Sequence, residues 1–361
     1  MAKQGNQKIK IILSGGGTGG SVTPLLAIAQ ELKEDSDFDF LWVGTKEGPE
    51  IKMVKDANIR FISIHSGKLR RYFSINNFID IFKIILGFVE SLYLVLKYKP
   101  NLMLSAGSFV SVPLAYASWM CRVPIIIHQQ DVRPGLANKL MAPLSKIITV
   151  TFEKSLKDYG KKAILVGNPV RRSLKCNLSQ SEAKKKMGLK ENFPVCLVIG
   201  GGTGAEFFNK LVLNNLDKLS SFCQILHITG KGKKKKIDEY CNYYVFEFLD
   251  SKQLSLAYRA AEVVVSRCGM GVLTELSFFA KPSILIPIPD SHQEDNAKVF
   301  QDKKAAIVLN QKEMDDVVFV ETIKKILDNY SLQQKLSARI RSVIKSDAAN
   351  KIKEIIINFL K

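Results

Sequence analysis

Two glycine-rich turns follow short apolar runs, one early in each half of the chain. Residues 15–20 are Gly-Gly-Gly-Thr-Gly-Gly, and residues 200–205 are Gly-Gly-Gly-Thr-Gly-Ala. A strand that ends in glycines and enters a helix leaves backbone N–H groups unpaired at the helix start, where the helix dipole adds positive potential. Phosphate or diphosphate fits such a place, although glycine also permits tight packing of a strand against a helix. Two such turns at equivalent places favour phosphate binding.

A third glycine turn carries a carboxylate. Residues 266–276 again combine a strand end, glycines and an expected helix start, and Thr274 and Glu275 fall in the first turns of that helix. A carboxylate there can accept two hydrogen bonds from a ribose diol while the amides of the turn face a diphosphate. The alternative is an acid that the helix dipole alone favours at a helix start.

Side chains that carry both donors and acceptors follow in the polar segment 287–297. Gln293 and Asn296 suit sugar hydroxyls there, and a solvated helix start is the alternative. Loops at the carboxyl ends of strands are where open α/β sheets bind ligands. This segment is therefore a second part of a candidate sugar-nucleotide site.

The first half offers candidates for proton transfer and charge. His128 directly follows the apolar run 125–127, so it is either a general base at a strand end or a hydrogen-bonded structural histidine. Arg171 closes the segment 167–171 and can pair with phosphate or lie on the surface. Neither early glycine turn continues into Gly-Lys-Ser/Thr, and the dinucleotide fingerprint is imperfect, so ATP hydrolysis and NAD chemistry lose ground.

Short β-branched runs that alternate with helical patterns must position these residues. This alternation is typical of βαβ units and a parallel sheet, and a second series begins after the basic interval 172–192. We therefore predict two consecutive α/β domains. The expected strands are residues 8–13, 38–43, 102–104, 125–127 and 147–150, then 195–199, 224–228, 243–246, 263–266, 283–286 and 306–309.

The most hydrophobic long stretch, residues 75–98, is predicted to be an amphipathic helix. Charged and amide side chains recur in it too often for a membrane span, and its apolar residues recur at helical spacing. The basic and aromatic segment 68–73, Lys-Leu-Arg-Arg-Tyr-Phe, precedes it. Together the two segments could set basic residues against anionic headgroups, or the helix could be ordinary core packing.

Composition limits the class of protein. With 361 residues, 46% hydrophobic and 24% charged, the chain suits two domains and excludes a disordered or fibrous protein. The six cysteines lack metal-binding spacing, which excludes a disulfide-stapled mini-protein and a zinc module and suits a reducing cytosol. Residues 1–10 are polar and basic, so no signal peptide is predicted. The net charge of +19, from 53 basic and 34 acidic residues, should attract polyanions such as nucleic acid, nucleotides or an anionic membrane.

Taken together in their order, the motifs closely resemble the MurG family, the UDP-N-acetylglucosamine:N-acetylmuramyl-(pentapeptide)-pyrophosphoryl-undecaprenol N-acetylglucosamine transferases. The resemblance covers nearly the whole chain. It rests on residues 16–20, 128–131, 135–139, 167–171, 200–205, 267–275 and 292–297.

The resemblance implies the GT-B class of α/β fold, with two Rossmann-like, doubly wound parallel-sheet domains facing a cleft. Residues 1–170 would form the acceptor and membrane-side domain, and residues 171–340 the UDP-GlcNAc-binding domain. Residues 341–361 would be a helix that crosses back to the first domain.

It also implies an inverting transfer of GlcNAc from UDP-GlcNAc to the muramyl C4 hydroxyl of lipid I, which gives lipid II for peptidoglycan synthesis. No metal or other cofactor is expected. The implied partners are UDP-GlcNAc, lipid I and an anionic membrane surface at the cytoplasmic face of the cell membrane, not nucleic acid. The alternatives are another GT-B UDP-sugar:lipid transferase and a non-enzymatic polyanion-binding protein.

Residue roles are carried over from the family only where the motifs match. Glu275 resembles the ribose-binding acid, and Gln293 resembles the residue that contacts the GlcNAc hydroxyls. Arg171 matches the arginine that ends Asn-Pro-Val-Arg. The resemblance also gives a uracil-side pair, Phe248 and Leu249. It gives a helix start that faces the diphosphate, Met270, Gly271, Val272, Leu273 and Thr274. The first loop, which would face the donor sugar and the acceptor diphosphate, matches at Thr18, Gly19 and Gly20.

Three departures from the family pattern concern the chemistry. Ser21 stands where the family usually has a histidine favoured as the base, and a serine hydroxyl cannot serve as a base near neutral pH unaided. The family tetrad His-Glu-Gln-Asn is here His-Gln-Gln-Asp, which ends at Asp131, and in the second loop Gly202 and Thr203 replace serine and glutamine. We hypothesise that Asp131, or His128 through water, takes the base role.

Overall fold

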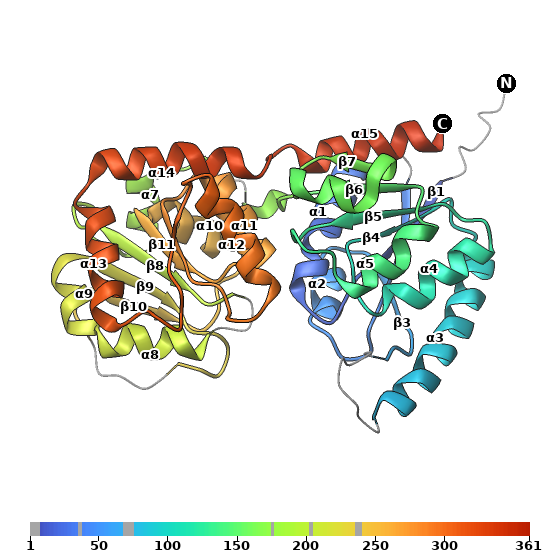
Figure 1. The fold of residues 1–361 in the computed structure, drawn as a ribbon, viewed down its shortest axis with the longest axis horizontal. Helices are drawn as coiled ribbons and strands as arrows, with labels where there is room; N and C mark the ends of the chain where they lie inside the picture. The colour runs from blue at the N-terminus through green and yellow to red at the C-terminus, as the bar shows by residue number, and fades with distance from the viewer. Residues whose placement is uncertain (1–7, 35–37, 68–75, 175–176, 202–204, 235–239) are drawn as a thin grey trace. The chain divides into compact units, whose positions relative to one another are not determined.

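The computed structural model describes residues 8–34, 38–67, 76–174, 177–201, 205–234 and 240–361, with the side chains of residues 76–79 excluded. It divides into two compact units (Figure 1). The first unit combines Met1–Arg171 with Ser346–Lys361, and the second is Arg172–Lys345.

The first unit is built on a seven-stranded parallel sheet with the order β3-β2-β1-β4-β5-β6-β7. The chain therefore reverses its direction of winding between β1 and β4, which is the place where such sheets bind ligands. The strands are β1 (Ile9–Ser14), β2 (Phe38–Gly44), β3 (Arg60–Ser63), β4 (Leu102–Ser105), β5 (Ile125–Gln129), β6 (Ile147–Val150) and β7 (Ala163–Leu165).

Helices cover both faces of this sheet because successive side chains of a strand point to opposite faces. Ile11 and Leu13 of β1 pack on one core, and Ile12 between them packs on the other. The last helix, α15, completes the first core, where Ile352 and Ile356 are fully buried beside α1. The helices are α1 (Thr23–Leu32), α2 (Glu50–Asp56), α3 (Asn76–Tyr98), α4 (Ser111–Met120), α5 (Leu136–Met141), α6 (Leu156–Tyr159) and α15 (Ala348–Leu360).

The second unit repeats the architecture with a six-stranded parallel sheet, in the order β10-β9-β8-β11-β12-β13. Its switch point lies between β8 and β11. The strands are β8 (Val195–Ile199), β9 (Gln224–Ile228), β10 (Tyr243–Phe246), β11 (Val263–Ser266), β12 (Ser283–Leu285) and β13 (Ile307–Val308). The helices are α7 (Gln180–Lys186), α8 (Glu206–Asn214), α9 (Leu216–Phe222), α10 (Ser251–Ala260), α11 (Met270–Phe279), α12 (His292–Asp302), α13 (Asp316–Leu327) and α14 (Tyr330–Val343).

The prediction of two doubly wound parallel-sheet domains is confirmed, and every strand expected from the sequence is present. The expected set did not include β3 and β7. Both are edge strands, and none of their residues is fully buried, so they lack the continuous apolar run that marks a central strand.

The predicted amphipathic helix is α3, which lies beside α4 on one face of the first sheet (Figure 1). Its Val95 and Tyr98 are buried in the core, whereas Phe82, with 72% of its surface exposed, lies on the opposite face. Within the described part of the chain, no helix is long and apolar enough to cross a membrane.

Candidate active site

The first glycine turn follows β1 at the switch point of the first sheet, and side chains from neighbouring elements hold it in place. Trp42 Nε1 donates to the carbonyl of Gly15 at 2.9 Å. The Ser108 hydroxyl, from the segment after β4, donates to the carbonyl of Gly16 at 3.0 Å, and Ser21 Oγ accepts from the Gly16 amide at 3.1 Å. Ser21 is buried, and its hydroxyl is used to close the loop.

A buried carboxylate that the sequence analysis missed lies under this loop. Glu50, at the start of α2, is fully buried and accepts from the Gly17 amide at 3.1 Å. It also accepts from the amide of Thr45, at 2.9 Å, and from the Thr45 hydroxyl. A Cβ on Gly16 would collide with the Glu50 carboxylate, so glycine leaves room for this buried side chain. In the sequence Glu50 looks like any acid at a helix start.

The internal bonds of Gly16 and Gly17 leave the outer part of the turn to face a ligand. Thr18, Gly19 and Gly20 are exposed or half-buried and begin a helical turn, where N–H groups have no acceptor within the helix. The predicted contacts of the first loop are therefore placed where backbone amides can meet a phosphate.

His128 is fully buried at the end of β5, and both ring nitrogens are engaged. Nε2 lies 2.8 Å from Asn168 Oδ1, and Nδ1 lies 3.0 Å from Thr149 Oγ1. Because an amide oxygen only accepts, the proton is on Nε2 and the Thr149 hydroxyl donates to Nδ1. Burial lowers the pKa of His128 to about 4. The geometry therefore favours the structural interpretation of His128 over a base that reaches a substrate.

The segment that carries Asp131 is held by its neighbour Gln129. Gln129 Nε2 donates to the carbonyl of Asp131 at 2.7 Å, and Gln129 Oε1 accepts from Asn138 Nδ2 at 2.6 Å and from the Tyr159 hydroxyl at 2.9 Å. A carboxylate at position 129 would have no N–H for the Asp131 carbonyl. The amide at position 129 thus suits the path that places Asp131, which is half-buried.

Asp131 and the first glycine turn lie along the same edge of the sheet, since both follow the carboxyl ends of parallel strands. One strand, β4, separates β1 from β5, so the ends of these two strands are about 10 Å apart. The segment after β4 joins them, because Gln130 Nε2 donates to the carbonyl of Ala106 at 3.3 Å and Ser108 bonds the turn. Arg171 is half-buried at the last residue of this unit's first segment.

In the second unit, Gly201 has φ +88°, a conformation that favours glycine. The predicted contacts Gly202 and Thr203 lie outside the described residues.

The helix start after β11 is the most complete part of the site. Gly269 is the N-cap of α11, and the next residues present their amides without intrahelical acceptors. The side chains of Met270 and Leu273 are buried in the core, so these residues can face a ligand only through their backbone. Gly271 and Val272 are half-buried. An added Cβ on Gly271 would meet no atom within 4 Å.

Thr274 and Glu275 are adjacent in sequence, but their side chains form hydrogen bonds with different partners. The Thr274 hydroxyl donates to the carbonyl of Met270 at 2.6 Å. Glu275 has 8% of its surface exposed and accepts from the Tyr258 hydroxyl at 2.9 Å.

Gln293 of α12 lies next to the start of α11. Its Oε1 accepts from the amide of Cys268 at 3.1 Å and from the amide of Ile288 at 3.3 Å. Asn296, fully buried, donates to the carbonyl of Cys268 at 3.2 Å. The structure thus brings Gln293 to the turn that is predicted to face the diphosphate, and the NH₂ group of Gln293 has hydrogens that could be donated to a sugar hydroxyl.

Arg267 adds positive charge at the same place. The guanidinium donates to the carbonyls of Ile286 and Pro287 at 3.1 and 3.2 Å, and it lies 4.7 Å from the ring centroid of Phe208. Burial lowers its pKa below the usual value. None of the ion pairs found between described residues includes Arg267, so its charge favours an anionic ligand.

The predicted uracil-side pair lies after β10. Leu249 is buried, whereas the ring of Phe248 is 58% exposed. Lys231, after β9, places its ammonium 5.0 Å from the centroid of that ring. The exposed face of an aromatic ring is a suitable surface for stacking a base.

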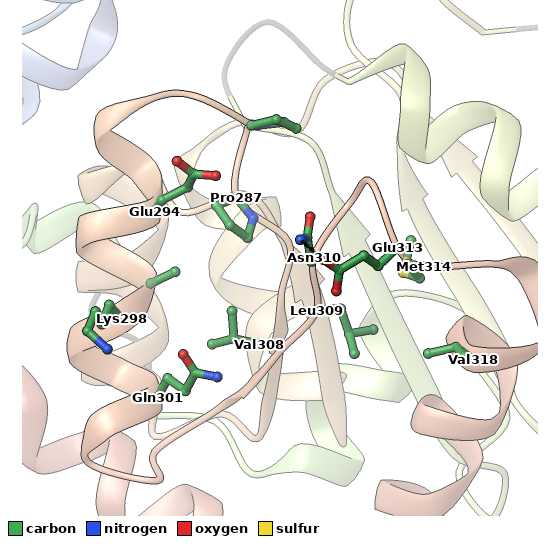
Figure 2. Close-up of a pocket in the computed structure, with 12 residues that line it drawn as sticks. Pro287, Glu294, Lys298, Gln301, Val308, Leu309, Asn310, Glu313, Met314 and Val318 are labelled. Carbon is green, nitrogen blue, oxygen red and sulfur yellow. Dashed lines mark hydrogen bonds between the residues drawn. The ribbon is translucent and has the colours of Figure 1, made fainter.

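A separate pocket of about 520 Å³ lies between α12 and the segment from β13 to α13 (Figure 2). Glu294, Lys298 and Gln301 of α12 face Val308 and Leu309 across it. None of the predicted donor residues lines this pocket. The described residues contain no group of three or more His, Cys, Asp or Glu that could hold a metal ion.

Comparison with known proteins identifies the class first. The glycosyltransferase family 28 N-terminal domain matches residues 11–150, and the family 28 C-terminal domain matches residues 195–355. Among solved structures, MurG of Acinetobacter baumannii superposes with a TM-score of 0.76 at 21% identity, covering 98% of this chain and 100% of that one. The kitacinnamycin glycosyltransferase superposes with a TM-score of 0.72 at 14% identity, and the superposition covers 99% of this chain and 100% of that one. The two family 28 domains define the chain as a glycosyltransferase, and two parallel-sheet domains of this kind form the GT-B fold.

Curated relatives then identify the family. A UDP-N-acetylglucosamine–N-acetylmuramyl-(pentapeptide) pyrophosphoryl-undecaprenol N-acetylglucosamine transferase of Clostridium kluyveri is 38% identical over 354 residues, covering 96% of this chain and 98% of the relative. The enzyme of the same name from Clostridium tetani is 37% identical over 328 residues, which cover 89% of this chain and 91% of the relative. The chain belongs to this transferase family, which confirms the resemblance found in its motifs.

Proposed function

We propose that this enzyme transfers GlcNAc from UDP-GlcNAc to the muramyl C4 hydroxyl of the undecaprenyl-pyrophosphoryl muramyl pentapeptide, lipid I, in peptidoglycan synthesis. The observation that carries this proposal is the group around the start of α11, where amides, the charge of Arg267, the Glu275 carboxylate and the donors of Gln293 gather at one sheet edge. Diphosphate, ribose and sugar each meet the chemistry that suits them. The names of the family relatives support the acceptor.

The second unit would stabilise the departing UDP. As the bond between the anomeric carbon and the phosphate oxygen breaks, its electron pair leaves with UDP, and negative charge grows at the diphosphate. The amides and dipole at the start of α11, together with Arg267, are fixed before the reaction and favour that charge. The exposed ring of Phe248 would stack the uracil.

The first unit would bind the acceptor and take its proton. The amides of Thr18, Gly19 and Gly20 suit the acceptor diphosphate, and Asp131 would accept the proton as the C4 hydroxyl attacks. Attack from the side opposite the leaving UDP inverts the anomeric carbon. His128 would act as a positioning residue that holds Asn168 of the Asn-Pro-Val-Arg motif.

The base role of Asp131 is tested by Asp131→Asn, which keeps the shape of the side chain. We expect kcat to fall by about 10²–10⁴-fold, the usual contribution of a general base, with little change in the KM for UDP-GlcNAc. Asp158→Asn, at an exposed site in the same unit, is the control. Turnover of Asp131→Asn near the parent level would remove Asp131 from the chemistry.

The reaction is tested by measuring UDP release with UDP-GlcNAc and a lipid I analogue. UDP-Glc, UDP-GalNAc and a reaction without acceptor are run beside it. We expect release that depends on the acceptor and occurs only with UDP-GlcNAc. Release with UDP-Glc and a different lipid acceptor would instead favour another UDP-sugar:lipid transferase.

We also propose that the exposed face of α3 and α4 docks on the cytoplasmic surface of the cell membrane. Phe82, Val89 and Leu96 of α3 and Trp119 of α4 are large apolar side chains exposed on two packed helices. Several large apolar side chains exposed on neighbouring helices are typical of membrane or protein contact sites. The basic segment 68–73, which the sequence analysis assigned to anionic headgroups, lies outside the described residues.

A further inference from the structure

A hydrogen bond between two neighbouring helices joins Tyr258 of α10 to Glu275 of α11. The Tyr258 hydroxyl donates to Glu275 Oε2 at 2.9 Å. The Tyr258 side chain is fully buried, whereas Glu275 keeps 8% of its surface exposed. Tyr258 itself therefore cannot meet a ligand, but the carboxylate that it contacts reaches the surface of the site.

The surroundings of Tyr258 fix the position of its hydroxyl. Its ring stacks on that of Phe279, with centroids 5.1 Å apart and an interplanar angle of 20°. The helix that carries it is fixed at its start, where Asp250 and Gln253 form a capping box. A hydrogen bond to a carboxylate is stronger than one between neutral groups, and a buried one is strengthened further. The bond therefore restrains rotation of the Glu275 carboxylate.

This restraint matters for recognition of a ribose. A carboxylate that accepts hydrogen bonds from two adjacent hydroxyls must turn its plane toward both. If the carboxylate rotates freely before binding, fixing it costs conformational entropy and weakens the binding. With Oε2 held by Tyr258, the carboxylate is oriented before the nucleotide arrives.

We propose that Tyr258 is a positioning residue that orients Glu275 toward the 2′- and 3′-hydroxyls of the donor nucleotide. The pair thereby sets the preference of the enzyme for a ribonucleotide donor over a 2′-deoxyribonucleotide donor. The inference rests on the proposed role of Glu275 in binding the donor ribose, and it adds the residue that makes this role selective.

A purely structural role for Tyr258 predicts a different result. If the bond only satisfied a buried hydroxyl, its loss would lower stability and reduce the rate with both donors equally. If the bond orients Glu275, its loss lowers kcat/KM more for UDP-GlcNAc than for the 2′-deoxy donor, because the deoxy donor offers the carboxylate only its 3′-hydroxyl. The ratio of kcat/KM for UDP-GlcNAc to that for 2′-deoxy-UDP-GlcNAc separates these roles, because partial unfolding lowers both values alike.

The test compares this ratio in the parent enzyme, Tyr258→Phe, Glu275→Gln and Tyr243→Phe. Tyr258→Phe keeps the ring stacked on Phe279 and removes only the hydroxyl. Tyr243→Phe is the matched control, because it removes a tyrosine hydroxyl that lies 3.0 Å from His227 Nδ1 in the same unit.

We expect Tyr258→Phe to lower the ratio by roughly tenfold, through a higher KM for UDP-GlcNAc with kcat little changed, as for a lost hydrogen bond to a charged group. Glu275→Gln should lower the ratio at least as far, and Tyr243→Phe should leave it at the parent value. A parent-like ratio in Tyr258→Phe beside a reduced one in Glu275→Gln would overturn the inference and leave the proposed function standing. A parent-like ratio in Glu275→Gln would overturn both the inference and the proposed ribose contact.

Discussion

Gln293 is a single side chain that serves both the fold and the proposed substrate. Its carbonyl oxygen is used by the amides of Cys268 and Ile288, which follow two neighbouring strands, so it aligns the ends of β11 and β12. Only the NH₂ group of the same amide can then donate to the GlcNAc hydroxyls. The two functions can be separated by changing one atom.

Gln293→Glu makes this separation. The carboxylate still accepts from the two amides, so stability should change little, but it has no hydrogen to donate. We expect the KM for UDP-GlcNAc to rise at least about tenfold, because the hydrogen-bond donor is lost and the added negative charge repels the diphosphate, with kcat less affected. Steady-state kinetics beside a urea unfolding curve measure both effects. A parent-like KM would mean that the NH₂ group does not contact the donor.

Two buried histidines make the stability of the fold depend on pH in a defined direction. Burial lowers the pKa of His128 and of His227 to about 4. In the unfolded chain these groups titrate near 6.5, so below that pH the unfolded state binds more protons. Above pH 6.5 the titration of these histidines does not change the free energy of unfolding. As the pH falls toward 4, it lowers that free energy by about 3 kcal/mol for each histidine.

Imidazole NMR measures this directly. Both histidines should remain neutral when the pH is lowered from 8 to 5. A titration midpoint near 6.5 for His128 would contradict its buried, neutral state and would reopen its candidacy as a base.

At the scale of elements, α11 illustrates what the sequence could and could not predict. The strand, turn and helix order at residues 266–276 predicted the helix start and the place of Glu275, because glycine and periodicity act locally. The partner Tyr258 comes from another helix, and Glu50 supports the first glycine turn from 30 residues or more along the chain. Contacts of this kind depend on tertiary packing, which local patterns do not encode.

The edge strands give the same lesson for the fold. Central strands such as β5 and β8 are buried along their whole length and are visible as apolar runs. The edge strands β3 and β7 have one open side and mixed side chains, so the sequence analysis did not find them. The sequence placed Thr274 in the first turns of a helix, and only the structure shows that its hydroxyl bonds the carbonyl of Met270.

Gly271→Ala tests whether the space beside the start of α11 is open. The added methyl meets no protein atom within 4 Å, and alanine favours the helix by about 0.5–1 kcal/mol. We expect higher stability with kcat/KM within about twofold of the parent. Gly16→Ala is the contrasting variant, because its Cβ would collide with the buried Glu50 carboxylate, and overpacking of this kind costs about 1–3 kcal/mol. Thermal unfolding measures both, and a destabilised Gly271→Ala would contradict the open space at α11.

At the scale of the whole molecule, charge and exposed apolar surface have a common explanation in a membrane-bound acceptor. On the proposed docking, the net charge of +19 would attract an anionic surface and the exposed face of α3 and α4 would supply apolar contact. Composition predicted the attraction to polyanions, and the helical spacing predicted the helix. Only the structure shows which apolar residues of α3 are turned to solvent.

Phe82→Ser tests this surface. We expect about tenfold weaker binding to vesicles that contain phosphatidylglycerol, since burial of an aromatic side chain contributes about 1.5–3 kcal/mol and is partial at an interface. Binding should also weaken as salt is raised. Tyr330→Ser, at an aromatic residue of the second unit that is 73% exposed, is the control and should bind as the parent does. Equal binding by both variants would exclude α3 as the docking helix.

The central claim is that a nucleoside diphosphate binds at the start of α11, held by its ribose and by backbone amides. A crystal structure of the full chain with UDP measures this most directly. The account predicts the ribose diol within hydrogen-bond distance of Glu275, the diphosphate at the amides after Gly269 and the uracil on the ring of Phe248. A nucleotide in the pocket between α12 and β13, away from Glu275, would contradict it.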